Sequence, residues 1–186
     1  VYVPLEGAMI SLSGQTDAQM ETLADGTYFF ANLQPGYDFT VTPFLDTLHN
    51  NGVSTLDMVK IERHILGIEP LDSPYKMIAA DANRNGYITV SDLVAMQRII
   101  LGLDSVFANN TSWRFVEEAF EFPDPGNPWA TLFPEAISVN DLNGDVTDAD
   151  FIAMKTGDVT LNAQTVNLLS TEERHTTEAV SFRTEE

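Results

Sequence analysis

An eleven-residue segment occurs twice in the chain, because Asp57–Gly67 aligns with Asp92–Gly102 without a gap. Asp, Val, Arg, Ile, Leu and Gly occupy the same positions in both copies. Each copy has apolar residues at helical spacing and ends in glycine, which favours the position after a helix. Two unrelated amphipathic helices would have no reason to share an Asp and an Arg outside the apolar stripe. The repeat therefore predicts two similar helices, at about residues 55–66 and 91–101, and two copies are fewer than the roughly three that a solenoid needs.

An oxygen-rich loop, Asp81–Asp92, precedes the second helix and matches the spacing of an EF-hand calcium loop. Calcium prefers about six to eight hard oxygen ligands, and alternating polar residues turn such oxygens inward. Gly86 permits the sharp bend, and Ile88 is the expected apolar anchor. The predicted ligands, with Tyr87 contributing its carbonyl, are Asp81, Asn83, Asn85, Tyr87, Thr89 and Asp92. Two Asn and a final Asp predict moderate affinity, and the alternative interpretation is a solvated Asx-rich turn.

The loop before the first helix is degenerate. If Asp57 holds the twelfth position, counting back places Asp46 first and Leu48, which can offer only a carbonyl, third. The ligands predicted on this alignment are Asp46, Asn50, Gly52, Ser54 and Asp57. If Gly52 is held at the sixth position instead, the loop is one residue short. A calcium site and an altered loop without an ion both remain open here.

A third acidic cluster begins at Asp141. It matches the first, third and fifth positions of a calcium loop, with Ile152 at the twelfth. The ligands that a third ion would use are Asp141, Asn143 and Asp145. The alternative is a solvated loop with an Asx turn. A short helix is predicted directly after it, around Phe151–Lys155.

The charge and cysteine content narrow the possible partners. The chain has 28 acidic and 9 basic residues, a net charge of −19, which repels phosphate backbones and anionic membranes. No run approaches the roughly 20 apolar residues of a membrane span. Cysteine is absent, so disulfides and thiolate metal sites are excluded. A small extracellular fold without disulfides commonly needs another staple, and bound metal is the usual one.

The remaining segments differ in character. Residues 1–43 read as strands and turns, with strands predicted at Ala8–Leu12, Thr27–Phe30 and Tyr37–Val41. Residues 106–140 are rich in aromatics and proline and predict an irregular wrap over the helix pair. Their Trp and Phe side chains could stack on sugar, but core packing is the more common use. The tail, residues 161–186, is polar, and Glu178–Arg183 alternates like a strand.

The loop–helix pair resembles type I dockerin domains over about residues 44–104, with Asp at the twelfth loop position and helices ending in Ile-Leu-Gly. Further stretches are similar to a dockerin-like segment of very long surface proteins in gliding and adhesive bacteria: Asn51–Asp57, His64–Gly67, Ser112–Phe115, Asp150-Phe151 and Lys155–Val159. Gly7–Thr42 resembles carboxypeptidase-regulatory-like or Cna-B-like β-sandwich repeats, which usually act as stalks or spacers. The first loop departs from the dockerin pattern, and the wrap could cover the helix faces that would bind cohesin.

The resemblance implies an α+β chain. We expect a small β-sandwich (Ig or prealbumin-like) over residues 1–43, a dockerin-like calcium-binding domain with an irregular extension over 44–160, and an extended tail over 161–186. The expected function is a non-catalytic, Ca2+-stabilised structural module of a secreted bacterial surface or fibre protein. Copies or neighbouring domains of the same protein are the expected partners, joined by strand donation from the tail.

The alternative function is a module that docks a cohesin-like partner. An enzyme is not expected, because the chain has no Gly-x-Ser-x-Gly, His-Glu-x-x-His or phosphate-loop motif. The chain also lacks a start Met and a basic, apolar leader, so we expect a mature or excised piece. The resemblance implies a location outside the cell, at the cell surface.

Overall fold

The computed structural model describes residues 3–165, so the predicted strand Glu178–Arg183 lies outside the described residues. The described chain folds into short antiparallel sheets and three helices, which confirms the α+β class. The strands are β1 (Met9–Gly14), β2 (Ala18–Glu21), β3 (Phe39–Phe44), β4 (Trp113–Glu117), β5 (Ile137–Val139) and β6 (Phe151–Lys155). The helices are α1 (Thr55–Ile65), α2 (Pro74–Ala80) and α3 (Val90–Ile100).

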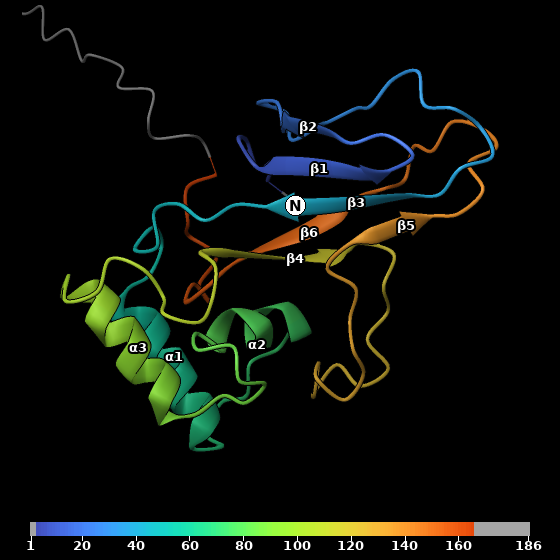
Figure 1. The fold of residues 1–186 in the computed structure, drawn as a ribbon. Helices are drawn as coiled ribbons and strands as arrows, with labels where there is room; N and C mark the ends of the chain where they lie inside the picture. The colour runs from blue at the N-terminus through green and yellow to red at the C-terminus, as the bar shows by residue number, and fades with distance from the viewer. Residues whose placement is uncertain (1–2, 166–186) are drawn as a thin grey trace, which may run out of the picture.

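Four strands form one antiparallel sheet in the order β2-β1-β3-β5, and β4 and β6 form a separate antiparallel pair. In Figure 1 the three helices gather on one side of the molecule, and the β4–β6 pair lies between them and the larger sheet. β5 pairs with β3, so the larger sheet takes a strand from beyond residue 43. The larger sheet therefore includes a strand from the part of the chain that follows the helices.

Alternation explains the strands that the sequence predicted correctly. Ile10 and Leu12 on β1 and Phe39 and Val41 on β3 are buried, and they pack into one cluster on the same face of the sheet. Thr27–Phe30 was predicted as a strand and has no regular structure. The partner of β1 in the hairpin is instead β2, an Ala-Gln-Met-Glu strand with little strand signal.

The predicted short helix at Phe151–Lys155 is wrong, because these residues form β6 and pair with β4. Five residues are too few to separate helical from extended periodicity. Pairing with Trp113–Glu117, which lies inside the segment predicted to be irregular, makes these residues a strand. The non-local partner thus overrides the weak local preference.

The two repeat helices are confirmed, and their ends match each other. α1 begins after Ser54 and α3 after Thr89, and in both the Asp of the repeat reaches back to that cap residue. Gly67 and Gly102 adopt left-handed φ angles of 67° and 66° after the last turn, as a glycine C′ position requires. α2 was not predicted, although Pro at its first position after Ser73 is a recognised start signal.

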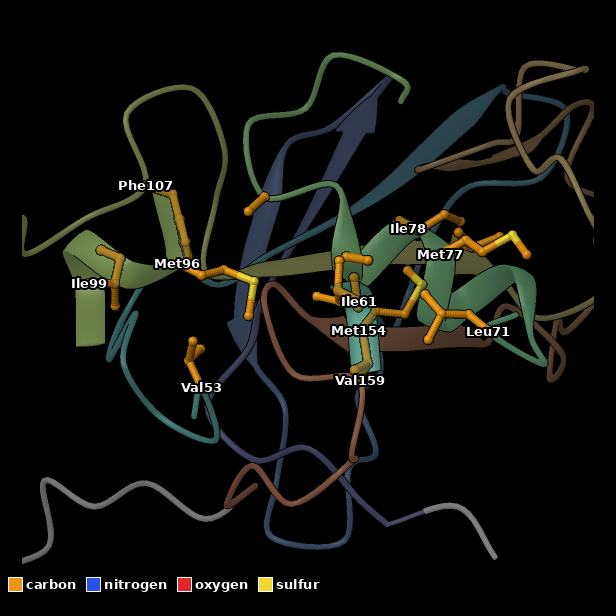
Figure 2. Packing of buried hydrophobic residues seen from close by; sticks show 14 of the residues in the cluster. Val53, Ile61, Leu71, Met77, Ile78, Met96, Ile99, Phe107, Met154 and Val159 are labelled. Atoms are coloured by element: carbon orange, nitrogen blue, oxygen red, sulfur yellow. The ribbon is translucent and has the colours of Figure 1, made fainter. Parts of the chain in front are cut away.

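The largest core lies between the three helices and the β4–β6 pair. Ile61, Ile78 and Met96 are fully buried, and the cluster also includes residues of the aromatic wrap such as Phe133. Figure 2 shows Val159, which follows β6, lying among the helix residues near Ile61. The segment after β6 therefore belongs to the helix core. Within residues 3–165, no helix is both long enough and apolar enough for a membrane crossing.

Candidate metal centre

The loop between α2 and α3 buries two carboxylates. Asp81 is the C-cap residue of α2, and Asp92 lies in the first turn of α3. Their exposed fractions are 1% and 0%. Because the loop connects two helices that both pack in the core, the backbone holds these two side chains in place from opposite ends of the loop.

Each carboxylate organises the loop backbone. Asp81 Oδ1 accepts a hydrogen bond from Asn85 N at 3.0 Å, and its Oδ2 accepts one from Gly86 N at 2.8 Å. Asp92 Oδ1 accepts from Asn83 N at 3.1 Å, and its Oδ2 accepts from Thr89 N at 2.8 Å. A carboxylate oxygen has a second lone pair, so each of these oxygens can also coordinate a cation. The carboxylates of the first and twelfth predicted ligands thus both bind N–H groups of the same loop.

The side-chain oxygen of Asn83 has no partner. Asn83 Oδ1 is inaccessible to solvent and accepts no hydrogen bond among the described residues, while its Nδ2 donates to Ser91 Oγ at 2.7 Å. A buried acceptor without a donor costs about 1–3 kcal/mol, and native proteins rarely leave one. Asn83 holds the third position of the predicted loop. The residues present therefore fit a hard cation, which would take up this oxygen.

No basic side chain compensates the negative charges of the two buried carboxylates of the loop within residues 3–165. Neither Asp81 nor Asp92 takes part in an ion pair with a basic side chain in the described part of the chain. Burial raises the pKa of Asp92, and the nearby charge of Asp81 raises that pKa further, although backbone hydrogen bonds oppose both effects. Two like charges in a poorly solvated site repel each other, and a divalent cation would remove this cost.

The other predicted ligands of this loop lie at its outer side. Asn85 is exposed and its Oδ1 accepts from Tyr87 N at 2.9 Å, while the Tyr87 side chain is 70% exposed, which leaves only its carbonyl as a candidate ligand. Thr89 caps α3, and its Oγ1 lies 3.2 Å from Asp92 Oδ2. Trp129 of the wrap lies beside Gly86.

Residues distant in sequence hold the loop in position. Asn110 Nδ2 donates to the Asp81 carbonyl at 3.0 Å in a buried contact. Arg84, inside the loop, pairs with Glu135 at 2.8 Å, and the other oxygen of Glu135 accepts from Arg114 of β4 at 2.5 Å. Sequence reasoning missed these supporting residues, because nothing local marks them.

The loop before α1 is built around Asp57, which is fully buried. Asp57 Oδ2 accepts from Ser54 N at 3.0 Å, in the same way that Asp92 accepts from Thr89. Its Oδ1 accepts from Val159 N at 3.0 Å, from Thr160 N at 2.9 Å and from Thr160 Oγ1 at 2.8 Å. The segment that donates hydrogen bonds to Asp57 therefore follows β6 in the chain.

The other residues predicted for this loop have different surroundings. Asp46 Oδ1 accepts from Ser112 N at 2.7 Å and lies 2.9 Å from His49 Nε2. Asn50 is exposed. Gly52 has a left-handed φ of 73°. Asp46 and Asp57 thus bind different partners. Among the described residues, the Asn50 side chain forms no hydrogen bond with either of them.

A carboxylate that sequence reasoning passed over lies beside Asp57. Asp158 is 1% exposed, its Oδ1 accepts from Asn162 N at 3.3 Å, and its Oδ2 accepts from Ala163 N at 2.7 Å. Asp81 likewise binds the N–H groups four and five positions after it. Thr160 donates to both Asp158 and Asp57. The available signal was the alternation of oxygen-bearing residues at 158, 160 and 162.

The third acidic cluster is exposed. Asp141, Asn143 and Asp145 all face solvent, and no hydrogen bond of residues 3–165 joins their side chains. Asp141 has a φ of 49°, and its N–H donates to Asp38 Oδ1 at 2.8 Å. The contacts of this loop are those of a surface turn against residues 36–38, which precede β3.

No group of three or more His, Cys, Asp or Glu side chains that could hold a metal gathers in the described part of the chain. The loop at 81–92 has two carboxylates, and its other candidate donors are carboxamide, hydroxyl and carbonyl oxygens. Comparison with protein-family models, with curated proteins and with solved structures gives no match. The case for a function therefore depends on the geometry of the loops.

Proposed function

We propose that this chain is a non-catalytic structural module of a secreted bacterial surface or fibre protein, and that Ca2+ bound at Asp81–Asp92 stabilises it. The observation that supports this most directly is the buried Asn83 Oδ1, which has no donor among the described residues. It lies in a loop whose two buried carboxylates form no ion pair within that part of the chain. A hard cation satisfies both the orphan oxygen and the excess negative charge. Here calcium takes part in no reaction.

Bound calcium would tie α2 to α3. Asp81 ends one helix and Asp92 opens the next, so an ion held by both fixes the angle between them. Binding to the folded state alone adds to its stability in proportion to the logarithm of the calcium concentration above Kd. External calcium then acts as the staple that disulfides supply in other small extracellular domains.

The finer fold assignment is part of the proposal. The matching caps and C-terminal glycines of α1 and α3 support a dockerin-like helix pair, and the face-sharing strands β1 and β3 support a relationship to β-sandwich spacers. Strand donation by Glu178–Arg183, outside the described residues, is the proposed way in which copies join. A chain that lacks residues 178–186 should then form no fibres under conditions in which the full chain does.

Terbium luminescence tests the metal site. Tb3+ replaces Ca2+ in oxygen sites, and the indole of Trp129 beside Gly86 is placed to sensitise it. We expect luminescence that calcium displaces, and a weaker signal in Asp81→Asn. Asp148→Asn, at an exposed acid, is the matched control and should bind as the wild type does. No displaceable signal, or equal signals from both variants, would refute calcium binding by this loop.

A second candidate function is docking of a cohesin-like partner. Equivalent positions of the two repeat copies expose large apolar side chains. Val59 and Val94 lie on α1 and α3, and Leu66 and Leu101, and Ile68 and Leu103, lie directly after the two helices; all six are 48–63% exposed. Arg63, Gln97 and Arg98 are exposed too, so the aromatic wrap leaves this face open. Exposed apolar patches of this kind often mark protein interfaces.

Capture by a purified cohesin-type domain tests docking. Leu66→Glu combined with Leu101→Glu should abolish capture, because both lie on the exposed face. Leu132→Glu is the control, since Leu132 is 94% exposed and lies in the wrap. Absence of capture by the wild type in saturating calcium would count against docking and leave the structural role untouched.

A further inference from the structure

The segment Asp158–Thr165 closes the loop of α1. The N–H groups of Val159 and Thr160 donate to Asp57, and the Asn51 side chain binds Gln164 twice. The Asn51 bonds are Nδ2 to the Gln164 carbonyl at 2.8 Å and Gln164 N to Oδ1 at 3.1 Å. Side-chain-to-backbone hydrogen bonds at Asn51 and at Asp57 thus join the α1 loop to a segment that lies about a hundred residues later in the chain.

The contacts repeat those of the 81–92 loop position by position. Asp158 binds its own fourth and fifth following N–H groups, as Asp81 does. The N–H two residues after each of these acids donates to the Asp at the twelfth position, from Thr160 to Asp57 and from Asn83 to Asp92. The first half of the α1 loop is therefore supplied by residues 158–163.

The two halves meet where a continuous loop would pass from its sixth to its seventh position. A Cβ on Gly52 would lie 2.7 Å from the Cα of Ala163, so the two backbones touch. With Asp158 first and Asp57 twelfth, Ala163 holds the sixth position and Gly52 the seventh. Asp46 and Asn50, which precede Gly52 in the chain, are displaced from the loop by this second segment.

We propose that Asp158–Thr165 is a calcium-operated clasp, docked on α1 in calcium and released without it. This inference rests on the proposed function, with Asp57, Asp158 and Thr160 as parts of a second, divided calcium loop. Asp57 and Asp158 are both buried, and Thr160 contacts both, so their charges repel across the junction when no cation is present. In the 81–92 loop the connecting chain holds the two halves together, whereas non-covalent contacts hold the two halves of the divided loop.

Hydrogen exchange measured by mass spectrometry, combined with ion counting by native mass spectrometry, tests the clasp on the full chain. In calcium, two ions should bind and the amides of Val159–Thr165 should be protected. Chelation should lower their protection at least tenfold while the amides of β1 and β3, which belong to neither loop, stay protected. Asp158→Asn should bind one ion and exchange quickly at Val159–Thr165 even in calcium.

The outcomes separate the clasp from the metal site. One bound ion in the wild type, lost in Asp81→Asn, with protection at Val159–Thr165 unchanged by chelator, overturns the clasp and leaves the proposed function standing. No bound ion at all overturns both. Asp148→Asn controls for the loss of one negative charge and should keep two ions and the wild-type protection.

Discussion

Asp57 Oδ1 accepts a hydrogen bond from the backbone N–H of Thr160 at 2.9 Å, which ties the start of the first repeat helix to the segment after β6. Asp57 is fully buried and Thr160 is half-buried. A buried carboxylate that binds several backbone N–H groups is expensive to remove, because each donor loses its acceptor at once.

Asp57→Ala should lower the free energy of unfolding by about 3 kcal/mol in excess calcium, because buried N–H groups of two segments lose their acceptor. Urea unfolding followed by circular dichroism measures this. Asp72→Ala is the control, since Asp72 pairs with Lys76 at the surface and its side chain is 75% exposed. Such a pair contributes less than about 1 kcal/mol. Equal losses in the two variants would show that Asp57 has no special structural role.

Asn83→Asp should have opposite effects with and without calcium. The added charge at the orphan oxygen should lower the Kd for calcium about tenfold. It should also destabilise the calcium-free protein, because it adds a third carboxylate beside Asp81 and Asp92, which form no ion pair with a basic side chain among residues 3–165. Calorimetric titration and urea unfolding in chelator measure the two effects. Asn109→Asp, at an exposed residue, should change neither. An unchanged Kd in Asn83→Asp would place the ion away from this oxygen.

Gly52→Ala should cost more than Gly67→Ala. Both glycines have left-handed φ angles, 73° and 67°, so both substitutions carry a similar backbone strain of about 1 kcal/mol. Only at Gly52 does the new Cβ meet a backbone, that of Ala163, whereas nothing lies within 4 Å at Gly67. We expect an additional loss of about 1–3 kcal/mol in urea unfolding. Equal losses would mean that the two loop halves do not touch.

Lys155 predicts a dependence of stability on pH. It is 3% exposed, and burial lowers its pKa from 10.5 to about 7, against the opposing charges of Asp158 and Asp46. Between these two pKa values the unfolded chain binds a proton that the folded protein does not, so the free energy of unfolding rises with pH across this window. Below about pH 7 the Lys155 contribution is constant and unfavourable.

Urea unfolding at pH 6, 7, 8 and 9 in excess calcium measures this slope. Lys155→Met should flatten it, because the buried cation is gone. Lys60→Met, on the less buried surface of α1, should keep the wild-type slope. A flat wild-type profile would indicate that Lys155 keeps its ordinary pKa, stabilised by its hydrogen bonds to the carbonyls of His49 and Thr156.

The sequence predicted what is encoded locally. The helix repeat and the span of the 81–92 loop follow from spacing, caps and glycines within short windows, so α1 and α3 lie where they were expected. The partners of Asp57 could not be predicted from the same pattern, because Asp158 and Thr160 reach it only through the path of β4 and β6. The same non-local pairing turned Phe151–Lys155 from an expected helix into a strand.

Thermal unfolding with and without calcium tests the central claim most directly. At a calcium concentration of about 100 Kd, each bound ion contributes roughly 2.7 kcal/mol to the folded state. For a chain of this size that predicts a Tm higher by roughly 5–10 °C or more in calcium than in chelator, with magnesium at equal ionic strength giving little change. Superimposable melting curves in calcium, magnesium and chelator would contradict the account.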